Sequence, residues 1–177
     1  MNAAGPDDTF DIVADAGRLR EIEELGILTG DADEILMEIA GEAARRIGMP
    51  ISLVSIVLDE AQFFAAAHGL EGWLDAVRGT PVEWSFCANA VRSGEPFVVE
   101  DALTHPVTRE NPLVLEDGIR CYAGVPLISS RGFSLGTLCV LGKEQRSFGD
   151  DDMLVLRECA KLAVERIEGR RGDKPVD

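Results

Sequence analysis

The chain alternates between stretches in which apolar residues recur with a helical period and stretches rich in β-branched residues. Leu19, Ile22 and Leu25 lie at three-residue steps, which predicts a short helix over 18–28. A pattern that repeats every four residues from Ile35 to Ile47 predicts a longer helix, capped by Asp31 or Asp33. A last helix is expected over 150–168, because its first turn carries three aspartates that suit the positive end of a helix dipole.

Between these helices the pattern changes to strands. Residues 51–58 (ISLVSIVL) are apolar at nearly every position, which indicates a strand that is covered on both faces. Further strands are expected over 63–68, 97–99, 119–128 and 134–141, the last two joined by a hairpin turn. Residues 69–84 and 104–118 show no clear period and are expected to be loops. This order of elements predicts an antiparallel α+β domain.

Length and charge narrow the classes of protein. A chain of 177 residues fits one domain, which we expect over 17–168, between a loose acidic leader (1–16) and a polar tail (169–177). The formal net charge of -15 argues against nucleic acid and anionic membrane surfaces as partners. The start of the chain has four aspartates and no signal-like pattern, and the four cysteines are widely spaced, so we expect reduced thiols and a cytoplasmic location.

Several segments together resemble a known family. These are ISLVSIVLDEAQFFAAAHGL, SFCANAVRSGEPFVVEDA, NPLV, RCYAGVPL and LGTLCVL. In this combination the chain resembles a GAF domain, the small-ligand sensor module of phytochromes, phosphodiesterases and many bacterial signalling proteins. The resemblance implies a central antiparallel sheet of five or six strands with the terminal helices on one face. Segments around 84–92 and 101–118 would cover the other face and enclose a ligand pocket.

The resemblance does not identify a reaction or a ligand. Reductases of free methionine sulfoxide are GAF proteins with a cysteine where Cys87 stands, but their reactive cysteine lies in the following loop. Here that loop (HPVTRENPLVLEDGIR) holds no cysteine. Bilin-attachment and cyclic-nucleotide motifs of the family are absent, and His68 and His105 are poor candidates for haem or zinc ligands. We therefore expect a non-catalytic sensor that signals through a partner protein or in trans, with no metal and an unknown cofactor.

The alternative function is cysteine chemistry. It would be either a free methionine sulfoxide reductase or a thiol redox switch. Cys121 and Cys139 lie on adjacent predicted strands, nearly equidistant from the hairpin turn, and are expected to approach each other.

The candidate ligand-binding residues are mostly aromatic side chains and thiols on the predicted pocket side. They are Phe64, Trp84, Phe86, Cys87, Asp101, Asn111, Tyr122 and Cys139. The aromatic and thiol members equally suit an ordinary core. For Asp101 and Asn111, a turn or a helix cap is the competing interpretation.

The terminal helices also predict a homodimer. The last helix carries a second apolar strip (Val155, Cys159 and Leu162) besides the face that packs on the sheet. The short helix over 18–28 has an apolar face of its own with no assigned partner. Pairing across a two-fold axis would bury both strips, as would folding of the short helix onto the strip within one chain.

Overall fold

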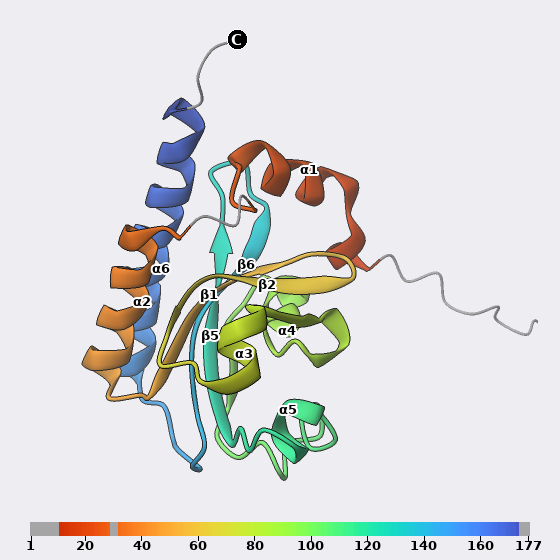
Figure 1. Cartoon of the computed structure of the whole chain (residues 1–177), viewed down its shortest axis with the longest axis vertical. Helices are drawn as coiled ribbons and strands as arrows, with labels where there is room; N and C mark the ends of the chain where they lie inside the picture. Colours follow the sequence, from red (N-terminus) through yellow and green to blue (C-terminus); the bar gives the residue numbers. More distant parts are fainter. Residues whose placement is uncertain (1–10, 29–31, 174–177) are drawn as a thin grey trace, which may run out of the picture.

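The structure, a computed structural model, describes residues 11–28 and 32–173 (Figure 1). The described strands form one six-stranded antiparallel sheet in the order β3-β2-β1-β6-β5-β4. Their bounds are β1 Ile51–Val57, β2 Ala61–His68, β3 Gly79–Pro81, β4 Phe97–Val99, β5 Cys121–Ile128 and β6 Ser134–Gly142. The predicted α+β class and the antiparallel sheet of five or six strands are confirmed.

Helices cover both faces of this sheet. The described α-helices are α1 Ala16–Leu25, α2 Glu34–Ile47, α3 Gly72–Val77, α4 Cys87–Ser93, α5 Pro112–Leu115 and α6 Asp150–Gly169. The 3-10 helices are η1 Ile12–Ala14, η2 Val82–Trp84 and η3 Arg170–Asp173. Figure 1 shows α2 and α6 side by side on one face, with α3, α4 and α5 on the other.

The central strand β1 contributes side chains to a hydrophobic core on each face of the sheet. All seven of its residues are buried, as its continuous apolar pattern predicted. Val54 and Ile56 belong to the core under α2 and α6, whereas Leu53 and Val57 belong to the core on the α4 side. Successive side chains of a strand point to opposite faces, so one strand supplies both cores.

Local signals set the ends of α2. The Asp33 carboxylate accepts hydrogen bonds from the backbone N–H groups of Ile35 and Leu36, each at 3.0 Å, so Asp33 is the N-cap. At the other end Gly48 takes the left-handed conformation (φ 78°), which glycine adopts without steric cost.

The N-terminal segment packs against its own chain. The helix expected over 18–28 is α1, which ends at Leu25 before a left-handed Gly26. Ile22 and Leu25 are buried in the same core as α2 and α6, so their partners lie within the described chain. Part of the stretch expected to be a loose leader is η1, in which Val13 is buried, while residues 1–10 lie outside the described residues.

A buried arginine fixes this segment near the turn between β5 and β6. The Arg18 side chain is almost fully buried and donates hydrogen bonds to four backbone carbonyls, those of Ile12, Val13, Ser134 and Leu135. Burial lowers the pKa of Arg18, and nearby aspartates led by Asp15 oppose that shift. Unpaired carbonyls would be costly in this buried place, so the guanidinium joins η1 and α1 to the sheet.

Two predicted loops contain regular structure. Residues 69–84 form α3, β3 and η2, and residues 104–118 include the single turn α5. These elements are three to six residues long, which is too short for a helical or strand period to show in the sequence. No helix in the described part of the chain is long and apolar enough to cross a membrane.

Candidate functional site

A small inner cavity lies between the sheet and α4. Its volume is about 30 Å³. Four of the predicted residues line it: Phe64, Phe86, Cys87 and Tyr122. The other lining residues are Leu53, Gln62, Leu70, Leu74, Leu113, Ile119 and Leu141. The sequence analysis therefore grouped side chains from β2, α4 and β5 in one candidate site, and these side chains lie together in the structure.

Two aromatic side chains that line this cavity, Phe86 and Tyr122, contact each other. The rings of Phe86 and Tyr122 meet edge to face with centroids 5.3 Å apart, and the ring centroid of Phe97 lies 5.9 Å from that of Tyr122. Tyr122 is buried, and its hydroxyl donates a hydrogen bond to the Cys87 sulfur at 3.2 Å. The Tyr122 ring thus packs against other aromatic rings while its hydroxyl has a hydrogen-bond partner, as is usual for a buried tyrosine.

Two buried thiols meet beside the phenol. The sulfurs of Cys87 on α4 and Cys139 on β6 are 4.0 Å apart. Burial disfavours a thiolate at either sulfur, but hydrogen bonds from Cys139, Thr137, Tyr122 and Ser55 outweigh burial at Cys87 and lower its pKa to about 6. Burial and the neighbouring Cys87 raise the pKa of Cys139 well above its ordinary value. The pair therefore favours one thiolate, at Cys87, next to one thiol.

A second polar cluster lies at the edge of the inner cavity and is centred on Gln62. Its side-chain oxygen accepts from the hydroxyls of Ser55 (3.1 Å) and Ser85 (2.7 Å), and its nitrogen donates to the Thr80 hydroxyl (2.7 Å). All four side chains are buried. Ser85 also accepts from the backbone N–H of Ala88 at 3.1 Å, which ties the start of α4 to β2.

A much larger hollow, which we call the outer groove, opens at one end of the sheet. Its volume is about 530 Å³, within the range of pockets that hold small molecules. Its lining combines apolar side chains with charges of both signs from Glu71, Asp117, Glu144, Lys143 and Arg146. Leu70, Leu74 and Ile119 line both the outer groove and the inner cavity, so the two adjoin.

The sequence analysis did not predict the residues that line the outer groove. Most lie at the start of β1, just after β2 and just after β6 (48–51, 69–71 and 142–146). Because β1 pairs antiparallel with both β2 and β6, the start of β1 and the ends of β2 and β6 lie next to one another at one end of the sheet. The pairing of β1 with β6 is the signal that would have indicated the groove, and the order of the predicted strands along the chain does not contain it.

The remaining predicted residues have local partners. Trp84 packs edge to face on Trp73, with ring centroids 6.1 Å apart. The Asn111 amide donates to the Trp84 carbonyl at 3.2 Å, and its side-chain oxygen caps α5 at Leu113 N–H. Asp101 accepts from the Leu103 N–H at 3.1 Å in a turn. Neither Trp84, Asp101 nor Asn111 lines the inner cavity or the outer groove, and Asp101 and Asn111 serve as the turn and cap that were the competing interpretation.

The expected approach of Cys121 and Cys139 is wrong. In the β5–β6 register Cys121 lies opposite Gly142, and Cys139 lies opposite Gly124. Positions 121 and 124 are an odd number of residues apart, so their side chains point to opposite faces of the sheet. Cys121 is buried in the core under α2 and α6, whereas Cys139 is buried on the α4 side.

No metal site forms in the described chain. Among the residues that the structure describes, no three His, Cys, Asp or Glu side chains come together in a way that could hold a metal ion.

Comparison with known proteins shows the family to which the chain belongs. Residues 30–168 match the GAF domain family, so the chain belongs to it. A cyclic di-GMP phosphodiesterase of Pseudomonas aeruginosa is 38% identical over 158 residues, which are 88% of this chain and 26% of that protein. The chain thus spans about a quarter of the length of this curated relative.

Solved structures share the fold at low sequence identity. A GAF domain of an Acinetobacter phosphoenolpyruvate-protein phosphotransferase has a TM-score of 0.65 and 17% identity, covering 91% of this chain and 96% of that one. Free methionine-R-sulfoxide reductase of Neisseria meningitidis, in complex with its substrate, has a TM-score of 0.64 and 22% identity, with the same coverage. At these identities the likeness shows the fold alone.

These comparisons contradict the expectation that the chain is non-catalytic and not an enzyme. The curated relative is named as a phosphodiesterase, and the structural neighbours include two methionine sulfoxide reductases. The expectation rested on motifs missing from a GAF stretch, and such motifs do not report on enzymes that are built with or around this domain.

Proposed function

We propose that this GAF domain is a sensor that binds a small molecule in the outer groove and controls the output of a signalling enzyme. The observation that carries the proposal is the groove itself, a 530 Å³ hollow that is lined by apolar and charged side chains and adjoins the inner cavity. A ligand that suits this lining has an apolar body and polar or charged ends. The relationship to a cyclic di-GMP phosphodiesterase supports an output in nucleotide signalling.

Two further parts of the proposal concern location and assembly. The four cysteines are unpaired and buried, which supports a reducing, cytoplasmic location. Exposed apolar side chains of α2 and α6 support a homodimer through these helices. The output of the sensor would then pass to a partner protein or act in trans.

The test is a thermal-shift screen of metabolites against the chain, followed by calorimetry on each hit. A Leu74→Trp variant narrows the junction of groove and cavity, so we expect it to weaken binding at least about tenfold. Val77→Trp is the matched control, because Val77 is exposed on the same helix and lines neither hollow. A screen with no hit, or equal affinity in wild type and Leu74→Trp, would contradict the proposal.

A further inference from the structure

The thiols of Cys87 and Cys139 have a geometry that an ordinary apolar core does not require. Their sulfurs are 4.0 Å apart, and a disulfide bond is about 2.05 Å long, so closure needs a movement of about 2 Å. The two residues lie on different elements, α4 and β6. A small shift or a rotamer change at the start of α4 would supply this movement.

The surroundings make the two sulfurs unequal. The Tyr122 hydroxyl donates to Cys87 at 3.2 Å and lies 3.5 Å from the Thr137 hydroxyl. Such donors stabilise a thiolate, and the pKa of Cys87 is accordingly lowered while that of Cys139 is raised. Cys87 is therefore suited to attack, and Cys139 to resolve.

A small oxidant has a place next to Cys87. The inner cavity that Cys87 lines has a volume of about 30 Å³, which exceeds the ~10–15 Å³ that one water needs. It adjoins the outer groove through Leu70, Leu74 and Ile119. A hydroperoxide as small as hydrogen peroxide fits this space far better than a bulky disulfide reagent does.

We propose that Cys87 and Cys139 form a reversible disulfide that a hydroperoxide makes and a dithiol reductant opens. With hydrogen peroxide, the Cys87 thiolate attacks one oxygen, the O–O bond breaks, and with one proton taken up the products are Cys87 sulfenic acid and water. The Cys139 sulfur then attacks the Cys87 sulfur, forming the S–S bond and releasing a second water. The two thiols are oxidised by two electrons and the peroxide is reduced by two.

The reverse step and the consequence follow from the same geometry. Both sulfurs are buried, so a dithiol reductant reaches the disulfide only when the start of α4 moves away from β6. It then returns two electrons through a mixed disulfide, restoring both thiols and becoming a disulfide itself. In the oxidised form the start of α4 is tied to β6, and the inner cavity changes shape. This redox site does not depend on the identity or existence of a ligand in the outer groove.

The sequence offers a direct experiment on the unmodified chain. The full chain is exposed to hydrogen peroxide, alkylated in denaturant and digested with trypsin without reduction. Cleavage after Arg78, Arg92, Arg120, Arg131, Lys143, Arg157 and Lys161 puts each of the four cysteines in a separate peptide. We expect a linked pair containing Cys87 and Cys139, loss of two free thiols, and recovery of both with a dithiol.

Variants separate a reactive pair from a packed core. Cys87→Ala and Cys139→Ala should each abolish the link, whereas the matched controls Cys121→Ala and Cys159→Ala should keep it. At pH 5, below the pKa of Cys87, Tyr122→Phe should slow oxidation about tenfold, because a rise of about one unit in that pKa lowers the thiolate fraction about tenfold there. Circular dichroism before oxidation establishes that each variant is folded.

The proposal is overturned if all four thiols of the wild type stay free under peroxide. It is equally overturned if the linked peptides contain Cys121 or Cys159 in place of Cys87 or Cys139. An unchanged rate in Tyr122→Phe would refute the part of the mechanism that makes Cys87 the attacking sulfur.

Discussion

Gln62 shows how much of the site's order depends on one buried amide. Its two polar atoms have partners on β1, β3 and the segment before α4, so a single side chain connects three parts of the pocket wall. An amide of this kind bonds several hydroxyls at once, and its loss takes one hydrogen-bond partner from each of them.

We expect Gln62→Leu to lower the free energy of unfolding by about 2 kcal/mol, because three buried hydroxyls lose a partner while the volume is nearly kept. The measurement is chemical denaturation followed by fluorescence. Gln145→Leu, an equal substitution at an exposed position, should change stability by less than about 0.5 kcal/mol. Equal effects of the two substitutions would show that the Gln62 cluster does not stabilise the fold.

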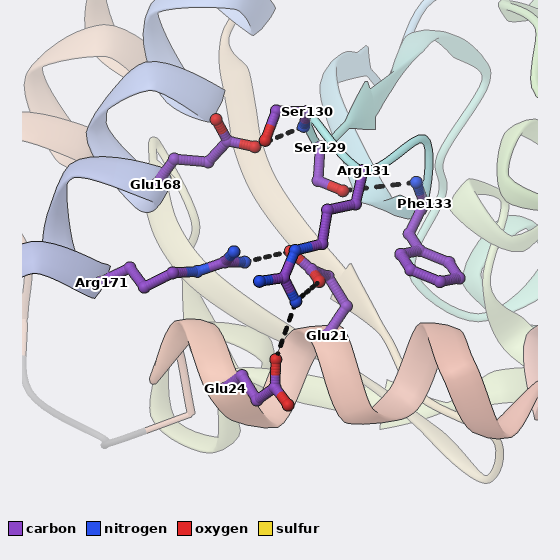
Figure 2. A network of polar contacts seen from close by, with 8 residues as sticks. All are labelled: Glu21, Glu24, Ser129, Ser130, Arg131, Phe133, Glu168 and Arg171. Carbon is purple, nitrogen blue, oxygen red and sulfur yellow. Dashed lines mark hydrogen bonds and ion pairs between the residues drawn. The ribbon is translucent and has the colours of Figure 1, made fainter.

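At the scale of elements, three segments that are distant in the sequence meet around the carboxylate of Glu21. Figure 2 shows Glu21 of α1 between Arg131 of the β5–β6 turn and Arg171 of η3. Arg131 also pairs with Glu24 at 3.1 Å, and Glu168 of α6 accepts from the backbone N–H of Ser130. The Glu21 side chain is buried, so these two arginines supply the ion-pair partners that its carboxylate needs in place of water.

Substitution of Glu21 by Gln should loosen the end of α6. We expect a loss of about 1–2 kcal/mol in unfolding free energy, since both arginines are partly exposed and keep some hydration. Hydrogen exchange should become faster in 129–131 and 167–171 before it changes in the sheet. Glu23→Gln, on the exposed side of the same helix, is the control. Unaltered exchange at the end of α6 would argue against this connection.

At the scale of the whole molecule, the sequence predicted the sheet better than the site. The long periodic elements were right because each buries one continuous face, as in β1 and α2. Four aromatic and thiol residues of the inner cavity wall were among the predicted site residues, because the resemblance implied a pocket between the sheet and the segment around 84–92. The outer groove and the Cys87–Cys139 contact were not predicted, because both depend on register and on where strand ends meet.

The structure also changes which surface is expected to form a homodimer. Cys159, expected in an exposed strip, is buried in the chain's own core, and Val155 packs partly against it. The apolar face of α1 is likewise covered within the chain. What remains exposed is a patch where α2 and α6 lie together, with Ile35 at 46% and Leu162 at 52% exposure beside a surface hollow.

We expect this patch to bury itself against a second copy, because apolar side chains gathered on two neighbouring helices gain free energy when they leave water. Light scattering should then give a mass about twice 19.1 kDa for the wild type. Leu162→Glu and Ile35→Glu place a charge in the centre of the contact and should each shift the chain to a monomer. Val77→Glu, which adds the same charge to an exposed apolar position on α3, should leave the dimer intact. A monomeric wild type, or a dimer that survives both central charges, would rule out this face as the interface.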